Sequence, residues 1–394
     1  MRIAIVSTYP PGKGSLNEYA FHFVRHLRQK AEVSEVIMLV DELPPGDQYQ
    51  LEDAPVPVKV EVCWRFGALD NALRIRRAVQ KHQPDIVFFN LQFATFGGSP
   101  VAASLGLLAA PLVRLSGVPA AVLLHNITET VDLKSAGFGD NPIKAALIRI
   151  FGTVFTRFLL TSNLIAVTIP LYVDILEKKY GAPNVFLAPH GVFEETPEPD
   201  FNLPPGAAQI MTFGKFGTYK RVDMLIEAFR GLRRQAKQPL ELVIAGTDSP
   251  NAAGYLESMR QQYADVPDVR YTGYVAEDDV PRIFNEAAVV VFPYSSTTGS
   301  SGVLHQAGSY GKAAVLPNIG DFAHLVTEEG YRAEFFQPED VASLETAIAR
   351  IIDDPDHRRE LGLANYAAAR GIPMRDVVDW YLLHFEQLIK QGAK

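Results

Sequence analysis

The stretch TTGSSGVLHQAGSYG, residues 297–311, follows the apolar run AAVVVFP (287–293), which has the composition of a buried parallel strand. A helix is expected to begin at about Gly302, so the stretch predicts a strand, a glycine-rich loop and a helix in succession. Residues 299–302, which read GSSG, allow a tight turn and place backbone N–H groups at a helix N-terminus, where the helix dipole favours an anion. An ordinary strand-to-helix turn with serine caps is the alternative interpretation.

Length and composition restrict the class of protein. The chain has 394 residues, which is long for a single core and predicts two domains. Its formal charge of −8 argues against a nucleic-acid-binding protein, which usually carries a basic excess. Cys63 is the only cysteine, so an intrachain disulfide and a multi-cysteine metal site are excluded, as expected for a cytoplasmic protein. The opening RIAIVS does not resemble a signal peptide, and no apolar run reaches the roughly 18 to 20 residues that span a bilayer.

Both halves of the chain alternate strand-like and helix-like segments. In the first half, strands are expected at residues 2–7, 36–40, 58–64, 85–90, 119–126, 164–168 and 184–191. In the second half, they are expected at residues 208–214, 240–246, 269–275, 287–293 and 312–317. Helical periodicity separates several of them, as in residues 72–82, 170–181 and 220–232. The pattern predicts an α/β fold of two doubly wound domains, with ligands at the carboxyl ends of parallel strands.

A polar, proline-rich segment, EETPEPDFNLPPG (194–206), interrupts this alternation. We therefore expect an N-terminal domain over residues 1–195, a linker over 196–206 and a second domain over 207–372. The helix expected over residues 373–394 is a candidate to pack back on the N-terminal domain.

The segment IKAALIRIFGTVFTRFLLTS (143–162) is unusually apolar and contains the scattered basic residues Lys144, Arg149 and Arg157. We favour a helix buried between the domains. An interfacial helix attracted to anionic lipid is the alternative interpretation.

Polar and charged side chains follow two of the expected strands. His125 and Asn126 come directly after an apolar strand, and a histidine that only caps the loop is the alternative interpretation. Positive charge is expected at the end of another strand, because that strand is followed by Lys215, Lys220 and Arg221. This charge suits a diphosphate leaving group. A solvated basic turn is the alternative there.

These segments together resemble the GT-B glycosyltransferases, and within them the large retaining family, glycosyltransferase group 1 or family 4-like, that includes sucrose-phosphate, trehalose and many mannosyl- and glucosyltransferases. The resemblance covers essentially the whole chain. Its motifs are YPPGKGSLNEYAFHFVRHL, LLHN, APHGV, FGKFGTYKRVDMLIEAF, ELVIAG, VRYTGYV, VVVFPYS and QAGSYGKAAVLPNIG. The family implies a GT-B architecture of two Rossmann-like domains facing a central cleft, which binds a nucleoside diphosphate sugar.

The resemblance also implies roles for individual residues. His125 matches the histidine that contacts the donor sugar near its anomeric centre, and Lys215 with Lys220 match the basic residues that hold the donor diphosphate. Gly12 and Gly14 match the glycine-rich first loop that closes over the sugar and phosphate. The nucleobase is expected against two further positions, mostly through their backbone: Tyr274 and Val275.

This sequence departs from the family at the stretch quoted first. The usual pattern is a glutamate, seven residues and a second glutamate, and here Thr298 and Gln306 occupy those positions. Gln306 can still accept a hydrogen bond from a ribose hydroxyl, whereas Thr298 cannot stabilise positive charge at the anomeric carbon as a carboxylate would. The donors still expected to receive phosphate or sugar oxygens are the backbone amides of Gly299, Ser300, Ser301 and Gly302.

The resemblance therefore implies retaining transfer of a hexosyl group from a UDP- or GDP-linked sugar to a hydroxyl acceptor. In this mechanism the departing diphosphate takes the acceptor proton, and the lysines and loop amides stabilise its charge. No metal and no cofactor are expected, only the nucleoside diphosphate sugar as co-substrate. The missing first glutamate leaves open a non-catalytic nucleotide-sugar-binding protein and, less favoured, a nucleotide-sugar epimerase.

The acceptor is expected on the N-terminal loops. The candidate residues are Asn90, Gln92, Asn126 and Asp132, although we favour reading them as solvated loop residues. A sugar, a glycoside and a lipid-linked acceptor all remain open. Nucleic acid is not an expected partner, and peripheral contact with a membrane is not favoured.

Overall fold

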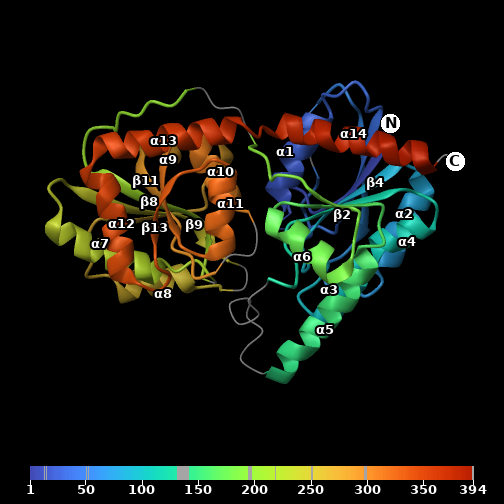
Figure 1. The fold of residues 1–394 in the computed structure, drawn as a ribbon, viewed down its shortest axis with the longest axis horizontal. Coiled ribbons are helices and arrows are strands. Elements are labelled where there is room, and N and C mark those ends of the chain that lie inside the picture. The colour runs from blue at the N-terminus through green and yellow to red at the C-terminus, as the bar shows by residue number, and fades with distance from the viewer. Residues whose placement is uncertain are drawn as a thin grey trace. The chain divides into compact units, whose positions relative to one another are not determined.

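The computed structural model describes residues 1–392 apart from residues 13, 15, 50, 52, 131–141, 194–197, 218, 250–251 and 297–299. The predicted site residues Thr298 and Gly299 and the acceptor candidate Asp132 therefore lie outside the described residues. Contacts divide the described chain into two compact units (Figure 1). Unit 1 contains residues 1–130, 142–193 and 374–392, and unit 2 contains residues 198–373.

Unit 1 is built on a parallel sheet of seven strands in the order β3-β2-β1-β4-β5-β6-β7. The strands are β1 (Arg2–Val6), β2 (Glu35–Asp41), β3 (Val58–Trp64), β4 (Ile86–Leu91), β5 (Ala120–Leu124), β6 (Leu164–Val167) and β7 (Val185–Leu187). The helices are α1 (Asn17–Leu27), α2 (Asn71–His82), α3 (Pro100–Leu107), α4 (Ala109–Leu115), α5 (Pro142–Leu159), α6 (Pro170–Tyr180) and α14 (Met374–Gly392). The sequence predicted every one of these strands. Most of them are continuous apolar runs, as expected for strands covered on both faces, whereas β3 alternates apolar and polar residues.

Helix α14 belongs to unit 1 although it follows unit 2 in the sequence. It packs on α1, and Figure 1 shows it in red beside the blue elements of the same unit. The rings of Tyr381 and Phe385 lie 4.9 and 5.7 Å from the ring of Phe88 in β4. Phe23 of α1 stacks on the same Phe88 ring at 4.9 Å. All four side chains are fully buried, and burial of each stabilises the unit by about 1.5 to 3 kcal/mol.

Unit 2 is built on a second parallel sheet, of six strands in the order β10-β9-β8-β11-β12-β13. The strands are β8 (Ala208–Phe216), β9 (Leu240–Asp248), β10 (Val269–Gly273), β11 (Ala287–Val291), β12 (Ala313–Pro317) and β13 (Ala333–Phe336). The helices are α7 (Val222–Gln235), α8 (Tyr255–Gln262), the 3-10 turn η1 (Glu277–Asp279), α9 (Val280–Glu286), α10 (Gly302–Ser309), α11 (Gly320–Glu328), α12 (Val341–Asp353) and α13 (Pro355–Arg370). β13 was not predicted, because this four-residue edge strand has too few buried positions to form an apolar run.

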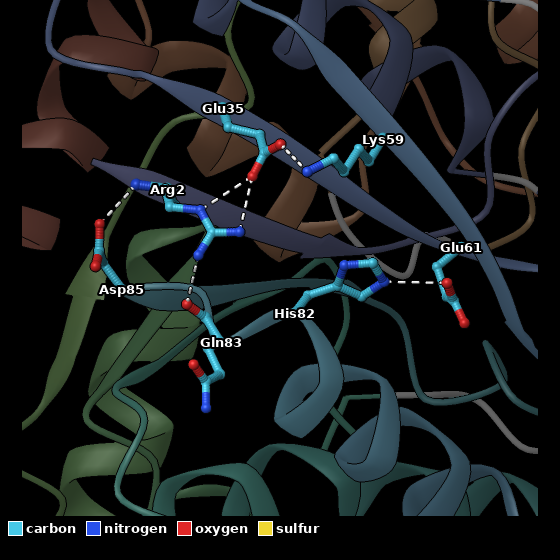
Figure 2. A network of polar contacts seen from close by, with 7 residues as sticks. All are labelled: Arg2, Glu35, Lys59, Glu61, His82, Gln83 and Asp85. Carbon is cyan, nitrogen blue, oxygen red and sulfur yellow. Dashed lines mark hydrogen bonds and ion pairs between the residues drawn. The ribbon is translucent and has the colours of Figure 1, made fainter.

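A network of ion pairs joins the amino-terminal ends of the unit 1 strands (Figure 2). Arg2 donates from Nε and Nη2 to Oε2 of Glu35 at 3.0 and 2.9 Å. The Lys59 ammonium lies 2.5 Å from the other oxygen of the same carboxylate. On its other side, the backbone N–H of Arg2 donates to Oδ2 of Asp85 at 2.7 Å. Because ligands bind at the opposite, carboxyl edge of such a sheet, we interpret this network as stabilising the fold.

Replacing Glu35 with glutamine is expected to lower the free energy of unfolding by about 1 kcal/mol at neutral pH, because two partly exposed ion pairs are lost. The hydrogen bonds from Lys59 and Arg2 lower the pKa of Glu35 from its ordinary value of 4.5. A lowered folded-state pKa stabilises the fold above the ordinary pKa, and this contribution disappears as the pH falls through the folded-state pKa. Urea unfolding of the wild-type protein and of Glu35→Gln should therefore show a difference in unfolding free energy that narrows below pH 4.5.

The matched control for this measurement is Glu257→Gln in unit 2. Glu257 has one exposed ion-pair partner, Arg260, at 3.8 Å, so its replacement should change stability by less than about 0.5 kcal/mol. A difference between wild type and Glu35→Gln that stayed constant as the pH was lowered would contradict the assignment.

Candidate functional site

Lys220 is a buried lysine in the connection between β8 and α7. Its side chain is 8% exposed, and its backbone forms a bridge with Tyr294, which follows β11. Two hydrogen bonds fix this connection: the N–H of Arg221 donates to the carbonyl of Pro293 at 2.7 Å, and that of Ser295 to the carbonyl of Tyr219 at 2.9 Å. Two strand ends that are neighbours in the sheet are thus joined around one lysine.

The Lys220 ammonium has an aromatic neighbour and, among the described residues, no acidic partner. Its Nζ lies 5.0 Å from the centroid of the Tyr294 ring. No carboxylate among the described residues pairs with it. Burial lowers the pKa of Lys220, and the nearby Tyr219 has a smaller, raising effect on that pKa. A buried lysine without a counter-charge is costly in a purely structural role, which makes it a candidate for binding an anion.

Gly214 leaves the space that the ammonium occupies, and Gly246 lets β9 approach Gly214 closely. Gly214, in β8, has a φ of 133°, and a β-carbon there would collide with Lys220 Nζ. Gly246, its partner in β9, has a φ of 135°, and a β-carbon there would collide with the Gly214 carbonyl oxygen. Glycine is therefore required at both positions, and it exposes the β8 backbone to the Lys220 side chain.

Lys215 also lies at the carboxyl end of β8, next to Gly214. Its side chain is exposed and forms no ion pair within the described part of the chain. Lys215 and Lys220 thus flank the same strand end, one exposed and one buried, which fits the sequence-based expectation of positive charge at this edge. Solvation of both lysines, the alternative interpretation, is wrong for Lys220 because that side chain is buried.

The loop before α10 supplies the next part of this edge. Gly302 begins α10 as expected, and the hydroxyl of Ser301 accepts a hydrogen bond from the N–H of Leu304 at 3.4 Å. Ser301 therefore caps the helix, as expected for an ordinary strand-to-helix turn with serine caps. Gln306 lies half-buried one turn into α10.

Ser300 is anchored to the interior of unit 2 by His305, a residue that the sequence did not single out. The Ser300 hydroxyl and His305 Nε2 are 2.9 Å apart, and His305 Nδ1 lies 2.8 Å from the Tyr331 hydroxyl. The carboxyl group of Glu329 lies 3.8 Å from the same ring, and burial, together with Glu328, raises its pKa to about 8. This shift favours the neutral form of the Glu329 carboxyl group at pH 7. The backbone entering α10 is thus held by a buried polar network.

In unit 1, His125 lies at the carboxyl end of β5 and is held by Asn90 of the neighbouring strand β4, which in turn contacts Ser7 after β1. Its Nε2 donates to Oδ1 of Asn90 at 2.7 Å, and Nδ2 of Asn90 donates to the Ser7 hydroxyl at 3.0 Å. Burial, followed by the effect of His190, lowers the pKa of His125 well below its ordinary value. His125 is therefore a neutral imidazole with its proton on Nε2, so its Nδ1 can accept a hydrogen bond.

Aromatic rings pack around His125. The Tyr19 ring lies edge-on to His125 at 4.8 Å and to His190 at 5.1 Å. The Phe193 ring lies 5.2 Å from His190 and stacks on His22 at 4.6 Å. Burial lowers the pKa of His190 to about 4 and that of His22 to about 3. The three histidines of this edge are therefore uncharged at neutral pH.

The first loop of unit 1 is compact. The N–H of Gly12 donates to the Tyr9 carbonyl at 3.0 Å, and the Asn17 side chain donates to the Gly12 carbonyl. A β-carbon at Gly14 would collide with the side chain of Thr8, which is buried. The glycines predicted for this loop are thus required by close packing at the end of β1.

The acceptor candidates are less exposed than expected. Asn90 is buried against His125, so the interpretation of a solvated loop residue is wrong there. Asn126 accepts a hydrogen bond from the N–H of Phe93 at 3.0 Å, which fixes the loop after β4. The N–H of Gln92 donates to the Thr95 hydroxyl at 2.8 Å in the same loop. These contacts give Asn90 and Asn126 structural roles at this edge.

The C-terminal part of the chain has a sequence match to a known family. Residues 207–354 match the family described as Glycosyl transferases group 1. These residues form a glycosyl transferase group 1 domain. A search of curated proteins with the whole sequence finds no match.

Solved structures show the fold of the whole chain. Sucrose-phosphate synthase from Thermosynechococcus elongatus is similar with a TM-score of 0.77 and 17% identity over 99% of this chain and 100% of that chain. HepE from Anabaena in complex with UDP and glucose is similar with a TM-score of 0.67 and 15% identity over 98% of this chain and 100% of that chain. The trehalose-6-phosphate synthase OtsA is similar with a TM-score of 0.71 and 13% identity over 98% of this chain and 99% of that chain. The chain therefore has the GT-B fold, and the predicted fold class of two Rossmann-like parallel-sheet domains is confirmed.

The group 1 domain contains both lysines and the whole of α10. It also contains Tyr274 and Val275, which directly follow the edge strand β10. Tyr274 is 82% exposed, so its ring is free for a ligand to contact, and the role of both residues in binding a nucleobase stays a prediction. Among the described residues of both units, no group of three or more His, Cys, Asp and Glu side chains is arranged to hold a metal ion.

Several residues of the two strand edges were missed by sequence reasoning. Tyr294 and His190 lie in motifs that resemble the family, yet neither was given a role. His305 occupies a buried position of α10, and a lone histidine among apolar helix residues is too weak a signal to identify a network.

Proposed function

We propose that the chain is a retaining glycosyltransferase that moves a hexosyl group from a nucleoside diphosphate sugar to a hydroxyl acceptor. The observation that carries this proposal is Lys220, a buried ammonium at the carboxyl end of β8 in the segment that matches the glycosyl transferase group 1 family. No carboxylate in the described part of the chain pairs with it. A diphosphate would supply the missing counter-charge.

Lys220 and Lys215 would act on the leaving group. As the bond between the anomeric carbon and the diphosphate oxygen breaks, negative charge grows on the diphosphate, and the two ammonium groups stabilise it. The acceptor oxygen forms the new bond on the same face, and its proton passes to the departing diphosphate. The neutral imidazole of His125 would accept a hydrogen bond from a donor-sugar hydroxyl. In this proposal the lysines carry the stabilisation, and no metal takes part in the transfer.

A uridine diphosphate sugar is the first donor to test. Two proteins with similar folds were solved with such compounds: HepE with UDP-glucose and the E. coli trehalose-6-phosphate protein with UDP-2-fluoro glucose. The hexose and the acceptor of this chain require direct measurement.

A non-catalytic nucleotide-sugar-binding protein is the second candidate. The observation that favours it is the absence of any glutamate between Glu286 and Glu328, so that Thr298 and Gln306 replace the expected acidic pair. Binding of a donor without transfer to any acceptor would support this candidate over the first.

Calorimetric titration tests the proposal. We expect one of UDP, GDP and ADP, or of their glucose and mannose conjugates, to bind the wild-type protein. Lys215→Ala and Lys220→Ala should each weaken that binding about 10-fold or more, because each removes a charge-assisted hydrogen bond to phosphate. The control is Lys237→Ala, an exposed lysine before β9 at the amino edge of the same sheet, which should bind as wild type does. Absence of binding to every nucleotide would refute both candidates.

A further inference from the structure

Helix α5 of unit 1 exposes a stripe of large apolar side chains. Ile150, Val154 and Phe158 are 60%, 43% and 50% exposed, and their spacing of four residues places them on one face. Phe151, 46% exposed, lies beside them. The opposite face is packed inward, with Leu159 among its buried residues. Unit 1 by itself therefore does not bury the stripe 150–158, and the expectation of a helix buried between the domains stays a prediction.

The charge of α5 is opposite to that of the chain. Its sequence contains Lys144, Arg149 and Arg157 and no acidic residue, in a protein with a formal charge of −8. Arg149 and Arg157 are exposed, and neither forms an ion pair with a described residue. They are eight residues apart and precede Ile150 and Phe158, so they lie along one border of the apolar stripe.

The described carboxylate next to the stripe, that of Glu129, is paired. Lys179 of α6 contacts the Thr153 hydroxyl at 3.2 Å and pairs with the Glu129 carboxylate at 3.0 Å. The same carboxylate accepts a hydrogen bond from Tyr180, and the guanidinium of Arg157 lies 5.9 Å from the Tyr180 ring centroid. Within unit 1, Figure 1 shows the amino-terminal half of α5, in green, projecting past α3 and α6.

We propose that α5 is an interfacial helix that docks unit 1 on the surface of an anionic lipid bilayer. The apolar stripe enters the boundary between headgroups and acyl chains, while the aliphatic stems of Arg149 and Arg157 follow it and their guanidinium groups contact lipid phosphates. A second copy of the chain is the other possible occupant of such a stripe. The bilayer fits better, because two α5 helices packed together would bring unpaired arginines of like charge into one interface.

Flotation with lipid vesicles tests this inference without any sugar nucleotide, so its failure is distinguishable from failure of the proposed function. Wild-type protein is expected to float with vesicles of phosphatidylcholine and phosphatidylglycerol in equal parts, but not with phosphatidylcholine alone. Binding should weaken with added salt, because the attraction to anionic headgroups is screened. The paired change Arg149→Gln and Arg157→Gln should reduce partitioning about fivefold for each arginine.

The apolar stripe is tested separately by the paired change Phe151→Ser and Phe158→Ser, which should lower partitioning at least about tenfold because it removes two inserted rings. The matched control is Leu383→Ser, since Leu383 is 63% exposed on α14 and should be dispensable for vesicle binding. Circular dichroism should show that every variant remains folded.

Two results would overturn the inference. The first is wild-type protein that does not float with the mixed vesicles, or folded α5 variants that float as well as wild type. The second is light scattering that shows a wild-type dimer which the stripe substitutions convert into a monomer, because the stripe would then be an interface between copies.

Discussion

The variant Lys220→Ala should transfer sugar with a kcat about 10²- to 10³-fold below that of the wild-type protein. This is the loss typical of removing one preorganised donor to a developing anion. The ammonium is buried beside Tyr294 and has no carboxylate partner among the described residues, so its interaction with a diphosphate is not weakened by solvent. Steady-state kinetics with the donor identified by calorimetry would measure the effect.

Two further variants make this result interpretable. Lys220→Met keeps an unbranched apolar stem beside the Tyr294 ring, so it should be as inactive as Lys220→Ala while losing less stability. Lys237→Ala, at the amino edge of the sheet, should retain the wild-type kcat. Full activity in a folded Lys220→Met protein would mean that this ammonium does not assist departure of the diphosphate.

The variant Gly246→Ala should lose about 3 to 5 kcal/mol of unfolding free energy, the largest stability effect that we expect from any single methyl group in this chain. Its φ of 135° is strained for any residue with a side chain, and the added carbon would collide with the Gly214 carbonyl oxygen in the neighbouring strand. Backbone atoms of paired strands cannot move apart without breaking the ladder between β8 and β9. Denaturant unfolding measures the loss.

The variant Gly254→Ala separates the cost of backbone strain from the cost of the collision between strands. Gly254 also has a positive φ, of 84°, but a β-carbon there would meet no atom within 4 Å. Backbone strain alone should therefore cost this variant about 1 kcal/mol. Equal losses in Gly254→Ala and Gly246→Ala would show that the collision between strands is absent in solution.

Much of the fold could be predicted from the sequence, because buried parallel strands are continuous apolar runs. VIMLV and AAVVVFP identify β2 and β11 without knowledge of any contact. β13 was not predicted from an apolar run, because most of its AEFF sequence is only half-buried or exposed at the sheet edge. Helix α5 was placed correctly along the chain, yet the sequence could not show which of its faces is covered, since that depends on neighbours distant in sequence.

The candidate site was predicted in its positions more than in its contacts. His125 and Lys220 were identified because each follows a strand, where parallel sheets bind ligands. The hydrogen bond from His125 to Asn90, however, joins residues 35 positions apart in sequence. Contacts of this kind depend on strand order and register, as does the placement of Tyr294 under Lys220. For the same reason Asn90 was read as a solvated residue and is in fact buried.

The return of α14 to unit 1 has a consequence for the order in which the protein can be completed on the ribosome. Phe23 and Phe88 are synthesised before unit 2, whereas Tyr381 and Phe385, which cover them, are synthesised after it. Unit 2 needs nothing beyond residue 373. The amino-terminal unit can therefore be completed only after the whole of unit 2 has been synthesised, and until then its sheet lacks the cover that α14 provides.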